Sequence, residues 1–169
     1  AVAQQNNQAS INEWVAMEFL FEKQWAALRT YCAARGICLL GDIAVYVAHD
    51  SVDVWMNQEE FLVDEAGFPS VVAGAPPDSY SEFGQHWGNP IYRWDAMAKN
   101  NYAWWQKRFK RGLVLYDTLR VDHFRGFESY WAVPAEAEDA RSGCWVDGPG
   151  FSFFEVLQEY LGPLPLVAE

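Results

Sequence analysis

Residues 37–43 read ICLLGDI, a nearly continuous apolar run that includes one aspartate, Asp42. Such a run is typical of a β-strand that is covered on both faces, as in a parallel sheet. Upstream, apolar residues recur at helical spacing over residues 14–31, between a Ser-x-x-Glu capping box at residues 10–13 and Gly36. This part of the chain therefore predicts a long helix followed by a buried strand.

Two further helix–strand pairs are predicted downstream. The first is a helix at residues 101–111, ending at Gly112, with a strand at residues 113–121. The second is a helix that begins at a capping box in residues 152–155 and ends at Gly162, followed by a strand that runs to the end of the sequence. This order favours parallel strands joined by crossover helices, either in a (β/α)8 barrel or in an open doubly wound sheet.

Residues 47–92 interrupt this pattern after the first strand. Proline and glycine punctuate the stretch, and only one hairpin is indicated, at residues 61–72 around a Glu-Ala-Gly turn. A stretch of this length without periodicity is usually functional or forms a small subdomain. Because three strands cannot close a barrel of eight, we expect residues 1–169 to be an interior fragment of a larger α/β enzyme. The predicted fold is a partial (β/α)8 TIM barrel of about three strands, with a loop-rich insertion after the first.

The composition argues against several classes of function. The net charge of −11 disfavours nucleic acid, since phosphate binding needs clustered Lys and Arg, and the basic run at residues 107–111 is expected to be a solvated helix face. No stretch approaches the roughly 18 apolar residues of a membrane span, and the N-terminus lacks the order of a signal peptide. The three cysteines and three histidines show neither disulfide nor metal spacing, so we expect a reducing compartment and neither a metal nor a cofactor.

Aromatic residues make up 17% of the chain, and many of them lie in loop-like sequence. A flat apolar ring with a polar tip suits the face of a pyranose, so exposed aromatic residues favour a sugar site. Ordinary packing in the core is the alternative explanation.

A carboxylate lies at the end of each predicted strand: Asp42, Asp122 and Glu169. In a barrel the carboxyl ends of the strands carry the catalytic groups, so the three acids would converge on one site. Arg120 lies two residues before Asp122 and hence on the same strand face, where its charge would keep the aspartate ionised, as a nucleophile requires. Any one of these acids could instead cap a helix or pair with arginine, and His123 is expected to form hydrogen bonds rather than bind a metal.

Four motifs resemble one enzyme family. They read GDIAVYVAHDSVDVW at residues 41–55, VAGAPPD at 72–78, GQHWGNP at 84–90 and RVDHFRG at 120–126. On these motifs the chain is identified as a member of the 4-α-glucanotransferases, also called amylomaltases or disproportionating enzymes, which form glycoside hydrolase family 77 of the α-amylase clan. The resemblance extends from about residue 19 to residue 169.

This resemblance implies the roles of individual residues. Asp122 matches the nucleophile, Glu169 the general acid/base, and Arg120 the arginine that orients the nucleophile. The further substrate-binding positions that it implies are Asp42, Tyr46, Ser79, Tyr80, Trp87, Asn89 and His123. Ser79 and Tyr80 would lie at the tip of a mobile loop over the acceptor side, but they replace a usual aromatic pair, and Ala44 replaces a usual proline.

The resemblance also implies the reaction. It is a retaining double displacement that transfers α-1,4-glucan segments between malto-oligosaccharides, without a cofactor, in starch and glycogen metabolism. The two reacting carboxyl groups should be roughly 5–5.5 Å apart. The expected location is the cytoplasm of a bacterium or the plastid stroma of a plant or alga.

The 169 residues alone are expected to be inactive, because the family's third carboxylate, an Asp after a His, lies outside them. Two alternatives remain for the whole protein: an α-glucan hydrolase of the same clan, and a non-catalytic glucan-binding module with Trp and Tyr as stacking platforms.

Overall fold

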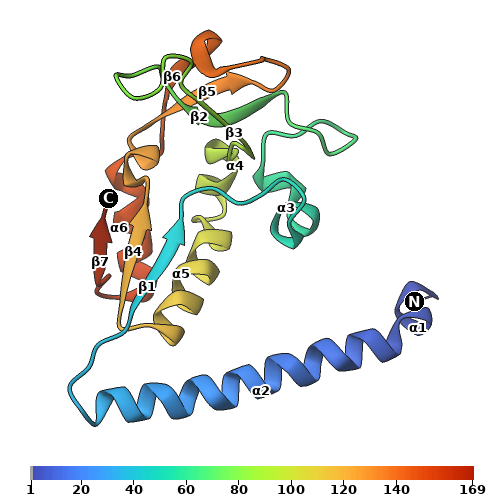
Figure 1. Ribbon diagram of the computed structural model, residues 1–169, viewed down its shortest axis with the longest axis vertical. Coiled ribbons are helices and arrows are strands. Elements are labelled where there is room, and N and C mark those ends of the chain that lie inside the picture. The colour runs from blue at the N-terminus through green and yellow to red at the C-terminus, as the bar shows by residue number, and fades with distance from the viewer. Residues whose placement is uncertain (1) are drawn as a thin grey trace.

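The computed structural model describes residues 2–169. Figure 1 shows three parts: a long N-terminal helix, a parallel sheet with helices behind it, and an antiparallel sheet at the carboxyl ends of the parallel strands. None of the helices in the described part of the chain has the length and apolar character that a membrane span needs.

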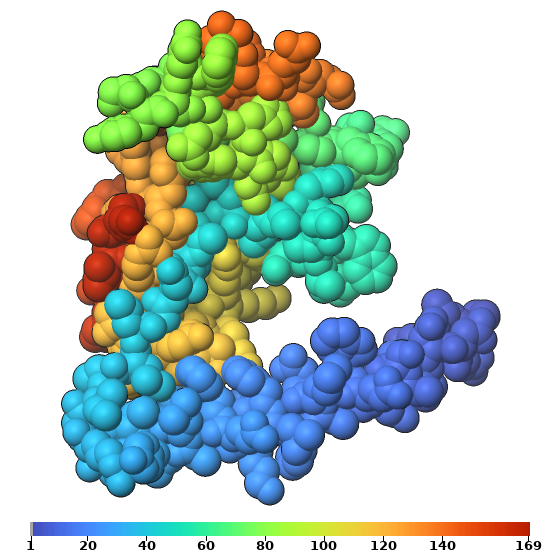
Figure 2. All heavy atoms as spheres, in the orientation of Figure 1, coloured from blue at the N-terminus to red at the C-terminus, as the bar shows by residue number. Residues whose placement is uncertain are grey.

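The N-terminal part consists of α1 (Val2–Asn6) and α2 (Gln8–Ala33). The predicted capping box at residues 10–13 is wrong, because α2 begins at Gln8 and the Ile11 amide already donates to the Asn7 carbonyl at 2.9 Å. Only the C-terminal part of α2 is anchored to the body, where the Trp25 indole donates to the Leu115 carbonyl at 2.8 Å. The N-terminal part of α2 projects away from the rest of the molecule (Figure 2).

The parallel sheet contains β1 (Leu40–Ala44), β4 (Thr118–Asp122) and β7 (Leu166–Ala168), in the order β1-β4-β7. All three strands are parallel, which confirms the predicted pairs of helix and strand. Leu119 and Val121 are fully buried, on the face covered by α5 (Ala103–Leu115) and α6 (Phe151–Leu161). The expectation of cover on both faces is wrong for the described residues, because the alternate positions of β1 and β4 are only half-buried or exposed.

One glycine and one capping box act differently from the prediction. Helix α5 does not end at Gly112 but continues to Leu115. Gly112 lies inside it because a Cβ there would be 2.8 Å from a methyl of the buried Leu119, so the glycine allows close packing of helix on strand. The capping box at residues 152–155 is also wrong, since α6 begins after Gly150, whereas its predicted end at Gly162 is confirmed.

The second sheet is antiparallel and was not predicted. It contains four strands in the order β3-β2-β5-β6: β3 (Gln85–Pro90), β2 (Val71–Ala75), β5 (Ser129–Pro134) and β6 (Cys144–Asp147). It thus combines strands from before and after the parallel strand β4. The predicted hairpin at residues 61–72 is reduced to one antiparallel bridge between Val63 and Pro69.

Short helices connect these strands: α3 (Val52–Met56), α4 (Trp94–Lys99), and 3-10 helices at Gln58–Glu60, Phe124–Phe127 and Ala140–Ser142. A cluster of aromatic side chains packs between the two sheets and the helices, with Trp105 in contact with Tyr92, Trp94, Phe127 and Phe153. The Tyr92 hydroxyl donates to the Val45 carbonyl at 2.7 Å, which joins the chain after β3 to the chain after β1. Much of the aromatic content therefore belongs to the core, and this core positions β3 at the carboxyl ends of β1 and β4.

Candidate active site

The Arg120 guanidinium connects the three acids at the strand ends. Its Nη1 donates to Asp42 Oδ2 at 2.6 Å, and its Nη2 donates to Asp122 Oδ1 at 3.0 Å. The same Nη2 atom also contacts the Glu169 carboxylate. Asp42 is the register partner of Arg120 across the β1–β4 pair, and Asp122 is two residues further along β4, so all of these side chains lie on one sheet face. The predicted convergence of the three acids is therefore present in the structure.

The strand ends are held in place by backbone hydrogen bonds. The Val45 amide donates to the Asp122 carbonyl at 3.3 Å, and the Glu169 amide donates to the Val121 carbonyl at 3.2 Å. The Phe124 amide donates in turn to the Glu169 carbonyl at 2.6 Å. The backbones that carry both carboxylates are thereby fixed relative to each other, which a site for two-step chemistry needs.

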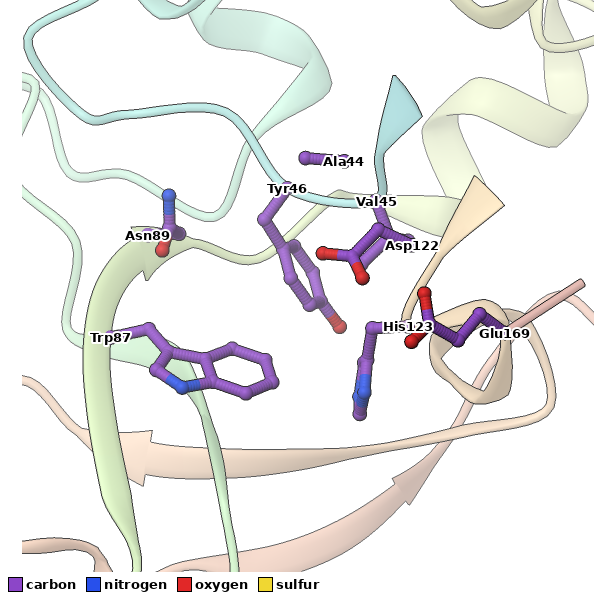
Figure 3. Close-up of a pocket in the computed structure, with 8 residues that line it drawn as sticks. All are labelled: Ala44, Val45, Tyr46, Trp87, Asn89, Asp122, His123 and Glu169. Carbon is purple, nitrogen blue, oxygen red and sulfur yellow. The ribbon is translucent and has the colours of Figure 1, made fainter. Parts of the chain in front are cut away.

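A cavity of about 390 Å³ opens beside the two carboxylates. Its lining contains Ala44, Val45, Tyr46, Trp87, Asn89, Asp122, His123 and Glu169. Figure 3 shows the His123 ring and the two carboxylates at one side, Trp87 and Asn89 at the other, and the Tyr46 ring between them. A cavity with aromatic walls and a few polar groups is suited to binding a sugar ring.

The turn after β4 aims His123 at the cavity. His123 adopts a left-handed backbone conformation with φ +54°, which is uncommon for a residue with a side chain. Burial lowers the pKa of His123 below its ordinary value of 6.5, Asp122 opposes this effect, and Arg125 adds to it. The indole of Trp87 stands edge-on to the imidazole, with 4.9 Å between ring centroids. His123 is thus favoured as a neutral imidazole.

Two polar atoms at the cavity are buried without a hydrogen-bond partner among residues 2–169: the Tyr46 hydroxyl and His123 Nε2. Burial, followed by the neighbouring Tyr92 and Tyr130, raises the pKa of Tyr46 well above its ordinary value, so its hydroxyl stays protonated. Buried polar atoms normally have partners, so these two atoms are exceptions in the part of the chain that the structure describes.

The remaining predicted positions divide into two groups. Asn89 lines the cavity, but its side-chain amide donates to the Val47 carbonyl at 2.9 Å. Ser79 and Tyr80 lie in the loop between β2 and β3, outside the cavity lining, with Tyr80 98% exposed. The tip of this loop is closed on itself, since the Asp78 carboxylate accepts from the Tyr80 and Ser81 amides at 2.8 and 2.7 Å.

The sequence did not identify Val45 as part of the cavity lining. Val45 is itself buried and precedes Tyr46 directly after β1, so its contribution depends on how the chain turns at the strand end. A valine at this position does not by itself indicate that the residue lines a cavity. No group of three side chains among the described residues is arranged to hold a metal ion.

Comparisons with known proteins agree on one family. The family model described as 4-alpha-glucanotransferase matches residues 1–169. The chloroplastic/amyloplastic 4-alpha-glucanotransferase of Solanum tuberosum is 43% identical over 98% of this chain and 29% of its own length. The 4-alpha-glucanotransferase of Thermus thermophilus is 47% identical over 90% of this chain and 30% of its own length. The chain therefore spans about 30% of the length of these curated relatives.

Solved structures give the same result. An amylomaltase from Streptococcus agalactiae in complex with acarbose superposes with a TM-score of 0.95 at 40% identity, covering 98% of this chain and 34% of that one. The amylomaltase from Corynebacterium glutamicum gives a TM-score of 0.70 at 25% identity, covering 82% of this chain and 19% of that one. The chain belongs to the 4-α-glucanotransferase family, whose solved members include these amylomaltases.

Proposed function

We propose that this chain supplies the nucleophile and the general acid/base of a retaining 4-α-glucanotransferase. The observation that carries the proposal is the shared contact of Asp122 and Glu169 with one nitrogen of Arg120, beside a cavity lined by Tyr46 and Trp87. Two carboxylates on neighbouring strands, facing one sugar-sized cavity, are the arrangement that retaining glycoside chemistry uses.

We propose further that the three parallel strands belong to a (β/α)8 barrel whose other strands are contributed by the rest of the protein. The face of the sheet that bears Asp42, Arg120 and Asp122 is partly exposed in residues 2–169, whereas the opposite face is covered by helices. The inner face of a barrel needs the remaining strands to cover it. In this arrangement residues 47–92 are an insertion at the carboxyl end of the barrel.

The reaction follows from these positions. The Asp122 carboxylate attacks the anomeric carbon of the donor glucan, and a glycosyl–Asp122 ester forms as the glycosidic C–O bond breaks. Glu169 gives its proton to the departing oxygen. Glu169 then takes the proton from the 4-hydroxyl of an acceptor glucan, which attacks the ester, regenerates an α-1,4 bond and frees Asp122.

The two carboxylates need opposite charge states at the start of the reaction. Arg120 contacts both carboxylates, and the nucleophile has to be ionised in order to attack. The Glu169 side chain is 58% exposed here, whereas a general acid needs a less polar environment in order to be protonated before it acts. We propose that a bound sugar separates Glu169 from Arg120 and covers it, so that it takes up the proton that it later donates.

The substrate class is proposed from the relatives. They are named as 4-alpha-glucanotransferases, and one solved amylomaltase holds acarbose. We propose α-1,4-linked malto-oligosaccharides as donors and acceptors. Because the Solanum tuberosum relative is named as chloroplastic/amyloplastic, we propose the plastid stroma if the source is a plant or alga, and the cytoplasm if it is a bacterium.

Incubation of the full-length protein with maltotriose tests the proposal. We expect glucose together with longer maltodextrins, and Asp122→Asn and Glu169→Gln should each lower the rate about 1,000-fold. Asp53→Asn, on the exposed part of α3, is the matched control and should retain the rate. Formation of reducing ends without longer products would favour a hydrolase, and full turnover by Asp122→Asn would favour a binding module.

The isolated 169 residues are a separate case. We propose that they are inactive, since most of the barrel and the family's third carboxylate lie elsewhere in the protein. Disproportionation of maltotriose by this polypeptide alone would contradict that.

A further inference from the structure

A second cavity, of about 280 Å³, lies beside α3 and away from the catalytic acids. Its walls are the chain after β1, helix α3 and the turn at residues 64–68, which lie side by side at the right of Figure 1. None of its lining residues lines the cavity beside Asp122 and Glu169. Two large aromatic side chains at this second cavity are exposed within residues 2–169, Trp55 by 72% and Phe68 by 63%.

The second cavity is built by specific contacts. His49 Nε2 lies 2.7 Å from the Gly67 carbonyl oxygen, which pins the turn to the chain after β1. The Asp64 carboxylate accepts from the Ala66 and Phe68 amides, both at 2.9 Å, and so fixes the turn itself. The shape of this cavity is therefore determined before any ligand binds.

Gly67 keeps the floor of the second cavity open. Its backbone has φ +87°, and a Cβ at this position would lie 3.3 Å from the Gln58 amide nitrogen. A larger residue at position 67 would therefore be strained and would also crowd Gln58.

The chemistry of these walls suits a neutral sugar. An exposed indole and phenyl ring can each cover the apolar face of a pyranose. The Asp50 carboxylate and the Gln58 amide make no side-chain hydrogen bond or ion pair among residues 2–169, so they are free to bind hydroxyl groups. The chain's net charge of −11 disfavours an anionic ligand.

We propose that this second cavity is an auxiliary binding site for an α-glucan chain, remote from the catalytic carboxylates. The proposal rests on the proposed function, because the glucan that the enzyme transfers is the sugar available to it. A short substrate such as maltotriose fills the catalytic cavity alone. A long glucan chain can occupy both sites at once, which raises its apparent affinity through the effective concentration of the tethered second segment.

The test compares long and short glucans on the full-length protein. Trp55→Ala and Phe68→Ala should each weaken retention in an amylose-containing native gel about ten-fold, since losing one stacking ring costs about 1.4 kcal/mol. Both variants should change kcat/KM for maltotriose less than two-fold. Trp14→Ala removes an equally exposed tryptophan, 65% exposed on α2, and should leave both measurements unchanged.

A polar variant covers the case in which the aromatic variants do not fold. Asp50→Ala alters an exposed loop residue and should weaken amylose retention while the melting temperature stays within about 2 °C of the wild type. Unchanged retention in all three variants, or an equal loss on maltotriose, would overturn the proposal. If the wild type is retained by amylose and Trp55→Ala is not, but maltotriose is never disproportionated, then the binding site stands and the proposed reaction fails.

Discussion

The Arg120 guanidinium lies 2.6 Å from the Asp42 carboxylate, and these two residues are register partners across the parallel strands β4 and β1. One guanidinium nitrogen of Arg120, Nη1, contacts Asp42 on β1. The other nitrogen, Nη2, contacts both Asp122 and Glu169. Asp42 is outside the cavity lining, and we propose that it acts on the chemistry through Arg120, as a positioning residue.

The forked shape of Arg120 is predicted to matter more than its charge. Arg120→Lys keeps the charge but cannot reach Asp42 and Asp122 through two separate nitrogens, so Asp122 loses its fixed orientation. We expect kcat for maltotriose disproportionation to fall about 100-fold in the full-length protein. Arg125→Lys, which removes the guanidinium 4.4 Å from the Trp145 ring, is the matched control. A loss below three-fold for Arg120→Lys would show that charge alone suffices.

Asn89 is predicted to position the wall of the catalytic cavity. Asn89→Asp keeps the size of the side chain but removes the donor to the Val47 carbonyl, a hydrogen bond worth about 1 kcal/mol. We expect roughly a five-fold decrease in kcat, measured by initial rates over a range of maltotriose concentrations.

Asn57→Asp is the control for Asn89, because Asn57 donates to the Asp53 carbonyl at 2.8 Å on α3 in the same manner. It should leave kcat unchanged. A higher KM with unchanged kcat in Asn89→Asp would instead indicate direct contact of Asn89 with the sugar.

The three strands and the three acids at their ends could be predicted from the sequence, because apolar runs and strand ends are local features. Arg120 and Asp122 share a face by simple alternation, so their proximity was also predictable. The contact of Glu169 with this pair requires β7 to lie next to β4 in the sheet. The sequence indicated this only through the order of the predicted strands along the chain.

The antiparallel sheet could not be predicted in the same way. Its strand β3 contains Gly88 at φ +77° and ends at Pro90, so it shows no alternation of apolar and polar residues. Its central pair joins Val72 to Val133, about 60 residues apart, and no local pattern reports such a pairing. Gly112 was misread as a helix end because the chain requires a small residue there for packing against Leu119, which is a tertiary effect.

Gly112→Ala is predicted to destabilise the protein. Alanine improves helix propensity by about 1 kcal/mol, but its Cβ would lie 2.8 and 3.0 Å from the two methyl groups of the fully buried Leu119. Overpacking of this kind costs about 1–3 kcal/mol, so we expect a net loss of about 1 kcal/mol in urea unfolding. Lys110→Ala on the exposed face of α5 should change stability by less than about 0.5 kcal/mol. A more stable Gly112→Ala would refute the close contact.

The pKa of His123 is predicted to lie below 6.5, chiefly because of burial. The unfolded chain then binds more protons than the folded chain between the two pKa values. The neutral ring's contribution to stability is therefore complete above pH 6.5 and is lost as the pH falls through the folded pKa. As the pH falls from about 7 to 5, the melting temperature of the wild type should therefore decrease more than that of His123→Gln.

The neighbouring Asp122 carboxylate, whose effect on the pKa of His123 is opposite to that of burial, gives a second test. Asp122 acts to raise the pKa of His123, so Asp122→Asn should lower it further. The midpoint of the His123 imidazole signal in an NMR titration measures this directly. A midpoint that moves up in Asp122→Asn would contradict the electrostatic relationship between the two residues.

Trapping of the covalent intermediate tests the identity of the nucleophile most directly. The full-length protein would be treated with 5-fluoro-α-glucosyl fluoride, which forms a long-lived glycosyl ester, then digested and sequenced by mass spectrometry. We expect one fluoroglucosyl group per protein, attached to Asp122 in the peptide that contains Arg120 and His123. Attachment to Asp42 or Glu169, or the absence of any label on a protein that still disproportionates maltotriose, would contradict it.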